Sequence, residues 1–189
     1  MSWPTQQRDR TRTRILESAA RLFALRGFEQ VGIDELMADA GLTRGAFYHH
    51  FQTKAELYAE AIRYSAKAGS ERLDELGAYG LGDLIEGYLR LTHAQGESMR
   101  CPLAFMATDV TRQEPKVRQA YSTALRNFVG RLEATAPAID RQQALQTTVA
   151  LIGGVVLARA VDDPHLAEEL LAACRSDCYA LLANPQESD

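Results

Sequence analysis

The 189-residue sequence has few of the features that mark cross-linked, fibrous or membrane-embedded proteins. Its three cysteines are an odd number without zinc-finger spacing, which argues against a disulfide framework. Thirteen glycines and six prolines indicate neither disorder nor a fibrous repeat. The longest strongly apolar run, Val149–Ala158, is about half a membrane span. The Arg-rich start, Met1–Arg14, is not followed by the apolar stretch of a secretory signal. We therefore expect a soluble cytoplasmic protein.

Motifs of the common enzyme classes are also missing. The sequence has no G-x-S-x-G elbow, phosphate-binding P-loop, dinucleotide fingerprint or H-E-x-x-H zinc motif. Cys101 and His93 would form a catalytic dyad only if folding brought them together. Cys174 and Cys178, four residues apart on an apolar helix face, lack further ligands for a metal and are expected to be buried. The sequence thus predicts no enzyme, no cofactor and no metal site.

The net charge of −4 is unevenly distributed. Residues 1–54 hold eight Lys and Arg against six Asp and Glu, a balance of +2, whereas residues 55–189 hold thirteen against nineteen, a balance of −6. Attraction to phosphate is local, because charges beyond about 10 Å are largely screened. A mildly basic N-terminal part is therefore compatible with DNA binding, although a solvated helix end would have the same composition.

Apolar residues recur with helical spacing along the whole chain, and no long stretch alternates with the period of a strand. Gly27 is placed to end the first helix and Gly41 to break the second, while Thr53 and Glu56 form a capping box for the fourth. We predict an all-α fold of about nine helices. After the first, the expected helices are 33–40, 44–50, 54–76, 83–95, 103–112, 115–135, 140–162 and 164–183.

The most informative segment is IDELMADAGLTRGAFYHHFQTK, residues 33–54, which predicts two short helices joined by a tight turn. Its apolar residues, Phe47 above all, can pack inward against the first helix. The exposed face of the second short helix then lies where a recognition helix presents its groove-reading residues, here Thr43, Arg44, Tyr48 and His49. The bland alternative is a short surface helix with an aromatic cluster.

The side chains on this face suit contacts with DNA. Arg44 can make a bidentate contact with guanine, and Gly45 lets the backbone approach base edges closely. Candidate phosphate partners are Tyr48, His49, His50 and Lys54. The sequence predicts a helix-turn-helix DNA-binding domain over residues 1–54, where a connecting helix starts, and a second domain over 55–189.

The stretch GLTRGAFYHHFQTKAEL, with LFALRGFEQ before it, resembles the DNA-binding domain of the tetracycline-repressor (TetR) family over roughly residues 10–60. The resemblance implies three helices and the start of a fourth, followed by a C-terminal helical domain for ligand binding and dimerisation. It implies base or groove contacts from Arg44, Gly45 and Ala46. It implies phosphate contacts from Thr43, Tyr48, His49, His50 and Lys54. The chain departs from the family at Val31–Ile33, where a capping hydroxyl is often found, and at Met37, where the family usually has Ala.

The expected helix 140–162 is apolar on two faces, and the expected helix 164–183 carries one matching apolar stripe. Two apolar faces suggest that the first of these helices is buried once in its own core and once against a partner. In the resembled family these helices form a four-helix dimer interface, although a monomer core is the alternative. The candidate interface residues are Leu145, Val149, Ile152, Gly153, Val156, Leu170, Cys174, Cys178 and Leu181.

The middle of the chain is rich in aromatic and methionine residues, which core packing alone would explain in part. The functional interpretation is a mostly apolar effector cavity with a few polar groups. Its candidate residues are Tyr64, Tyr88, His93, Cys101, Phe105, Met106, Thr108, Tyr121 and Phe128. Cys101 precedes a helix and follows Arg100, and both features lower a thiol pKa, so a redox or electrophile sensor is an alternative.

The sequence therefore predicts a homodimeric transcriptional regulator. It would repress by binding double-stranded, palindromic operator DNA and leave it when a small apolar or aromatic effector binds. The other class left open is a ligand-binding dimer whose N-terminal domain no longer binds DNA.

Overall fold

The computed structural model describes residues 5–75, 80–93, 101–136 and 138–183, and within these ranges it contains helices and no strands. The predicted all-α fold is confirmed, with ten helices in the described residues in place of about nine. They are α1 (Thr5–Gln30), α2 (Ile33–Asp39), α3 (Arg44–Tyr48), α4 (Lys54–Glu75), α5 (Leu81–His93), α6 (Pro102–Phe105), α7 (Ala107–Val110), α8 (Pro115–Thr135), α9 (Arg141–Ala160) and α10 (Pro164–Ala183).

The additional helix arises because the segment expected as one helix, 103–112, is two. Met106 separates α6 from α7 with φ −112° and ψ 0°, away from the values of a regular helix. Its side chain is fully buried, so the chain bends where a large apolar group must reach the core. No glycine or proline marks this bend, and the prediction of a single helix was therefore wrong.

The first helix is interrupted at Gly27, as its sequence predicts. Gly27 has φ +78° and ψ 169°, a conformation that strongly favours glycine. The next N–H, that of Phe28, leaves the helical pattern and donates to Oδ2 of Asp109 at 2.7 Å. This hydrogen bond joins the end of α1 to α7, although the two are 81 residues apart in sequence.

We expect Gly27→Ala to destabilise the protein by about 1–3 kcal/mol, because alanine disfavours this backbone conformation. The added Cβ would also lie 2.7 Å from Oδ2 of Asp109. Gly32→Ala is the matched control, since Gly32 has φ −84° and an added Cβ there would have no atom within 4 Å. Thermal unfolding of the two variants tests the prediction, and equal melting temperatures would contradict it.

The N-terminal helices share a core with the middle of the chain. Phe23, Phe28 and Tyr58 form an aromatic cluster between α1 and α4, with ring centroids 4.7–5.9 Å apart. Phe47 and Phe51 are fully buried in the same core, which continues into α6 and α8. The division of the chain at residue 54 stays a prediction, because this core holds residues from both sides of it.

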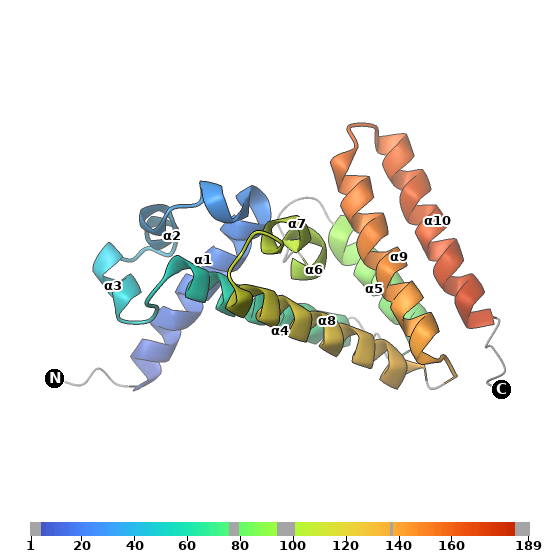
Figure 1. Ribbon diagram of the computed structural model, residues 1–189, viewed down its shortest axis with the longest axis horizontal. Coiled ribbons are helices and arrows are strands. Elements are labelled where there is room, and N and C mark those ends of the chain that lie inside the picture. Colours follow the sequence, from blue (N-terminus) through green and yellow to red (C-terminus); the bar gives the residue numbers. More distant parts are fainter. Residues whose placement is uncertain (1–4, 76–79, 94–100, 137, 184–189) are drawn as a thin grey trace.

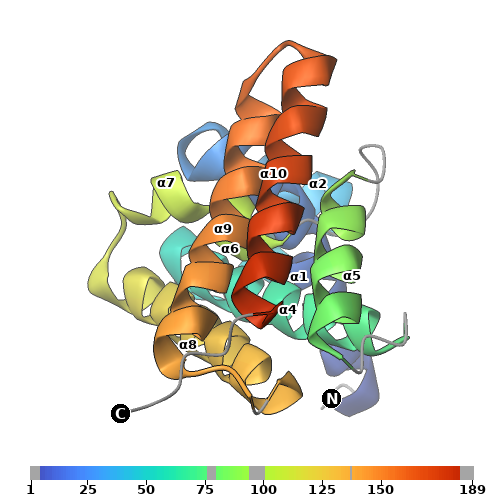
Figure 2. The same ribbon diagram turned by 90° about the vertical axis from the view of Figure 1, so that its right-hand side faces the viewer.

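The C-terminal helices form the other end of the molecule. Helices α9 and α10 make an antiparallel hairpin, which α5 covers on one side, and α8 runs beside α4 between the two ends (Figures 1 and 2). Leu151, Val155 and Cys178 belong to a second apolar core shared by α5, α8, α9 and α10. Helix α4 therefore extends from the N-terminal helices to the C-terminal part.

Candidate functional site

Helices α2 and α3 and the turn between them have helix-turn-helix geometry (Figure 1). At the end of α2, the N–H of Gly41 donates to the carbonyl of Ala38 and the N–H of Leu42 to that of Met37. This is the Schellman arrangement, and it requires the positive φ of Gly41, +64°. The Arg14 guanidinium also donates to the Ala40 carbonyl at 2.6 Å, which ties the turn to α1.

The predicted departures from the family pattern have structural counterparts. Helix α2 starts after Gly32, and no side chain makes a capping hydrogen bond there in the described residues. Thr43 is the N-cap residue of α3, but its hydroxyl also makes no capping bond. Met37 is 1% exposed and fills the crossing where a small residue was expected. Its flexible side chain fits this place without opening the helix pair.

The recognition face of α3 is exposed, as its sequence predicts. Phe47 points inward, and Tyr48 is 56% exposed. Ala46 is half-buried and packs against the core, so it is the least available of the predicted contacts. The other exposed members of this face are Thr43, Arg44, Gly45 and His49. Contacts of all these residues with DNA stay predictions.

Two predicted phosphate partners are less exposed than expected. His50 is half-buried, and burial together with Arg8 and Arg12 lowers its pKa, so it is uncharged at neutral pH. The Lys54 ammonium lies 4.3 Å from the centroid of the Phe28 ring, and burial lowers its pKa. The Phe28 ring therefore holds the Lys54 ammonium in place before any ligand binds.

Arg44 has an intramolecular partner that sequence reasoning missed. Its Nη1 lies 2.7 Å from Oδ2 of Asp34 on α2, and both side chains are largely exposed. Hydrogen bonding to Tyr48 and the charge of Asp34 raise the pKa of Arg44. The spacing of ten residues across a turn carries no helical signal, so only the folded geometry shows this pair.

The start of α4 is capped nearly as predicted. The Thr53 hydroxyl accepts from the N–H of Glu56 at 3.0 Å, while the Glu56 carboxylate accepts from the N–H of Gln52, one residue before the expected donor. Lys116 of α8 also donates to the Thr53 hydroxyl at 3.2 Å. The folded chain thus adds a cation from α8 beside the start of α4, next to the predicted phosphate partner Lys54.

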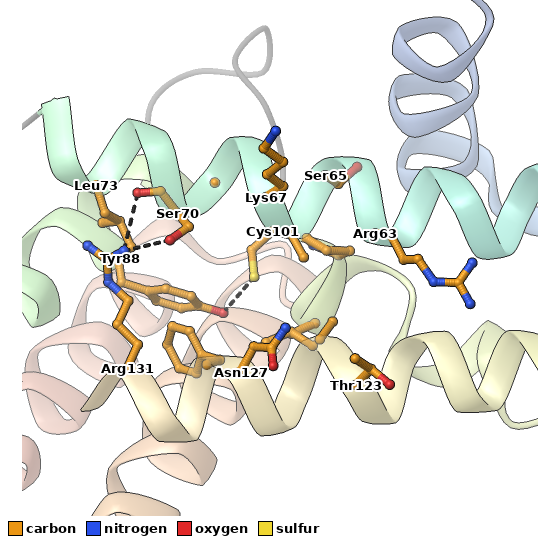
Figure 3. Close-up of a pocket in the computed structure, with 16 residues that line it drawn as sticks. Arg63, Ser65, Lys67, Ser70, Leu73, Tyr88, Cys101, Thr123, Asn127 and Arg131 are labelled. Carbon is orange, nitrogen blue, oxygen red and sulfur yellow. Dashed lines mark hydrogen bonds between the residues drawn. The ribbon is translucent and has the colours of Figure 1, made fainter. Parts of the chain in front are cut away.

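A cavity of about 540 Å³ lies between α4 and α8, and Tyr88 of α5 and the start of α6 complete its lining (Figure 3). Three of the predicted effector residues line it: Tyr88, Cys101 and Phe128. Its polar lining was missed, because such residues on α4 and α8 resemble ordinary helix surface. The main polar residues are Arg63, Lys67, Ser70, Thr123, Asn127 and Arg131.

Five other predicted effector residues do not line this cavity. Tyr64 donates to Glu17 at 3.2 Å, and Phe105 lies under the Arg159 guanidinium. Met106 is in the core, Thr108 is exposed, and the Tyr121 hydroxyl donates to the Leu103 carbonyl at 2.7 Å. The side chain of the remaining one, His93, lies outside the described residues.

Cys101 lies at the cavity with an unexpected electrostatic environment. The Tyr88 hydroxyl donates to its Sγ at 3.2 Å (Figure 3), and burial raises the pKa of Tyr88 well above its ordinary value. The helix start lowers the pKa of Cys101 as expected, through the backbone N–H groups of Leu103 and Ala104, but burial raises this pKa and outweighs the hydrogen bonds. Arg100, the other expected cause, lies outside the described residues. The thiol is protonated at neutral pH.

The N-terminal helices match a known protein family. The family described as "Bacterial regulatory proteins, tetR family" matches residues 15–61, which cover α2 and α3 and most of α1. Over residues 15–61 the chain belongs to the TetR family. This confirms the resemblance found in the sequence.

Curated relatives are similar to part of the chain. The regulator AcrR of Shigella flexneri is 42% identical over 55 residues, which are 29% of this chain and 26% of AcrR. The repressor NemR of Escherichia coli is 28% identical over 129 residues, 65% of each chain. The chain thus spans less than two thirds of the length of the curated relatives it matches.

Solved TetR-family structures share the fold of nearly the whole chain. The reduced form of Escherichia coli NemR superposes with a TM-score of 0.73 at 22% identity, over 88% of this chain and 95% of NemR. A TetR-family regulator from Streptomyces coelicolor gives a TM-score of 0.77 at 18% identity, over 99% and 97% of the two chains. At these identities the likeness establishes the fold.

The C-terminal hairpin has an exposed apolar face. Val149 is 71% exposed and Leu145 44%, whereas Leu151 and Val155 on the opposite face of α9 are buried. The predicted two-faced helix is therefore confirmed. The exposed face continues through Ile152, Gly153, Val156, Leu170 and Leu181, which are half-buried.

Two predicted interface residues are corrected by their burial. Cys178 is fully buried and Cys174 is 6% exposed, so both pack inside their own chain. Cys174 lies against Gly154, where an added Cβ would be 3.0 Å from it, while a Cβ on Gly153 would meet nothing within 4 Å. The close approach at Gly154 thus serves the α9–α10 crossing, and Gly153 remains available to a partner.

By length and composition alone α9 could cross a membrane, but it packs here on α10, α8 and α6.

Proposed function

We propose that this protein is a homodimeric transcriptional repressor of the cytoplasm, which leaves a palindromic operator when a small molecule with an apolar or aromatic body enters the cavity. The proposal rests on the position of α4, which connects the recognition helix with the cavity. This helix starts beside the recognition helix, and its residues from Arg63 to Leu73 line the cavity.

A ligand in the cavity can weaken DNA binding only if it binds the DNA-incompetent state more tightly. A change in the spacing of α4 and α8 supplies such a difference, because the two helices form opposite walls of the cavity. The same movement would displace Thr53, which caps the start of α4 and accepts a hydrogen bond from Lys116 of α8. By linkage, operator DNA weakens effector binding by the same factor.

The dimer is proposed from the exposed apolar face of α9 and α10. Two copies joined there by a two-fold axis would place two α3 helices in successive major grooves, about 34–36 Å apart. An isologous interface of this kind matches a palindromic operator.

Selection of genomic fragments by the purified protein, followed by titration, tests the proposal. Specific binding to a palindromic site supports a repressor. Cavity binding of small molecules without affinity for any fragment would instead identify a ligand-binding dimer that has lost its DNA function. Turnover of the bound molecule would identify an enzyme.

A second candidate function is electrophile sensing by Cys101, favoured by its place in the lining of the cavity. The thiolate sulfur would add to the β-carbon of an activated alkene, forming a C–S bond, while the α-carbon takes a proton from water. The similarity to NemR, whose solved structure is of a reduced form, agrees with a redox role. In this case Cys101→Ser abolishes the response to an electrophile and preserves that to a reversible ligand.

The raised pKa of Cys101 predicts slow and strongly pH-dependent alkylation. Only the thiolate reacts, so the rate with iodoacetamide should lie below that of free cysteine at pH 7 and rise about tenfold per pH unit until the thiol pKa is passed. Mass spectrometry of the labelled Cys101 peptide measures this rate, with Cys101→Ser as the blank. A rate that levels off near neutral pH would show an activated thiol.

A further inference from the structure

We infer that the effector of this cavity is an organic anion, with an apolar body and one acidic head group bound by Arg131. This inference rests on the proposed function and specifies the chemistry of its ligand. The proposed function specifies only a ligand with an apolar or aromatic body, whereas the charge of the lining also selects the head group.

The described residues that line the cavity carry charge of one sign. Arg63, Lys67 and Arg131 contribute cations, and no Asp or Glu is among the described lining residues. The acidic partners of these cations, Glu60, Glu71 and Asp74, lie on α4 outside the lining. The charged side chains of the described lining therefore favour an anion over a cation.

Arg131 is the best placed of the three to bind a head group. It reaches from α8 to α4, where its Nη1 donates to the Ser70 hydroxyl at 2.5 Å and its Nη2 to Oδ1 of Asp74 at 2.6 Å. Its side chain is only 21% exposed, whereas Asp74 is 60% exposed, so water screens the acidic partner. Its Nε–H is buried and has no acceptor among the described residues. A carboxylate oxygen that reaches the guanidinium would supply the missing acceptor.

The neighbours of Arg131 extend the polar side of the cavity. Thr123, Asn127 and Arg131 follow one another every four residues on α8, so they share one helix face. Figure 3 shows Arg131 at one end of the cavity, Arg63 at the other and Asn127 between them. The Asn127 amide can donate to a second oxygen of a head group held at Arg131.

The other two cations are less suited to the head group. Lys67 is 78% exposed, and in Figure 3 it points away from the cavity. Arg63 is 47% exposed and pairs with Glu60 at 2.8 Å. Arg63 therefore contributes at the rim, where it attracts an anion without enclosing it.

The remaining lining accommodates an apolar body. Leu73, Tyr88, Leu103 and Phe128 are large apolar or aromatic residues of the lining, and the Tyr88 and Phe128 rings lie 5.3 Å apart. The volume of about 540 Å³ is in the range of small-molecule sites. A carboxylate on an aromatic or alkyl body would satisfy both sides of the cavity.

Matched acids and amides test the inference without DNA. The probes are 2-naphthoate against 2-naphthamide and decanoate against decanamide, titrated calorimetrically into the full-length protein. At least one acid should bind about tenfold more tightly than its amide, and the difference should shrink with added salt. Equal affinities within both pairs, or no binding of either acid at millimolar concentration, would overturn the inference.

Variants locate the head group. Arg131→Gln should reduce the preference for the acid to about twofold or less while leaving amide affinity nearly unchanged. Arg131→Lys keeps the charge and should retain part of the preference. Arg118→Gln, an exposed arginine on the same helix outside the cavity, is the matched control. If Arg131→Gln does not fold, Asn127→Leu and Arg63→Gln test the same polar side, and an unchanged preference in both would overturn the assignment.

DNA binding separates this inference from the proposed function. If amides bind and release the operator while acids do not, the repressor stands and the anionic class is wrong. If acids bind through Arg131 but change no DNA affinity, the ligand class stands and regulation through the cavity fails.

Discussion

Val149→Asp is expected to convert the protein to monomers and to weaken operator binding by about a hundredfold or more. Val149 is 71% exposed at the centre of the apolar face of α9, so the proposed dimer would cover it. An aspartate buried there without a partner opposes association, while the exposed position spares the fold of the single chain. Sedimentation gives the oligomeric state, circular dichroism the helix content, and DNA titration the affinity.

The isosteric Val149→Thr is the control, because it adds a hydroxyl without a charge and should preserve the dimer. Val156→Asp and Leu170→Asp are less discriminating, since both side chains are half-buried and Val156 also packs on its own core. If Val149→Asp sediments as a dimer, the interface lies on another surface.

Arg44→Ala should cost about 1–3 kcal/mol per half-site on the operator and relax the choice of one base pair in each half. The loss arises because a bidentate contact to guanine cannot be replaced by a methyl group. Lys54→Ala should differ in kind: it should weaken all sequences alike and flatten the dependence of affinity on salt. Binding of both variants to operator and random DNA, at several salt concentrations, distinguishes the two roles.

Arg126→Ala serves as the control for a lost surface charge, because Arg126 lies on α8 and its guanidinium donates to Thr123 of its own helix. Its affinity for DNA should be unchanged. Equal losses on operator and random DNA for Arg44→Ala would remove its base-reading role.

The features that could be predicted from the sequence are local ones. The inward position of Phe47 and the two faces of α9 follow from helical spacing. The turns at Gly27 and Gly41 follow from the conformations that glycine permits. Each of these depends on residues within a few positions of one another, and each was confirmed.

The features that could not be predicted depend on which helices meet. Arg131 lines a cavity because α8 lies beside α4, and its spacing along the chain looks like helix surface. Tyr121 and Met106 were expected at the cavity for their size, yet size equally suits a core, where they bond or pack. The bend at Met106 accompanies the burial of its side chain in the tertiary structure, and no nearby residue in the sequence predicts it.

The ion pair between Arg44 and Asp34 makes the proposed contact with DNA an exchange. On a half-site with guanine in the right position, the Arg44 guanidinium would leave the Asp34 carboxylate and donate to two acceptor atoms of the base. On other sequences no such replacement exists, and Arg44 remains folded back on its own protein. Since a genome offers about a million or more wrong sites for each right one, this matters during the search for the operator. If Arg44 reads a base as proposed, Asp34 would compete with DNA for its guanidinium and shorten the residence time of the protein on ordinary DNA.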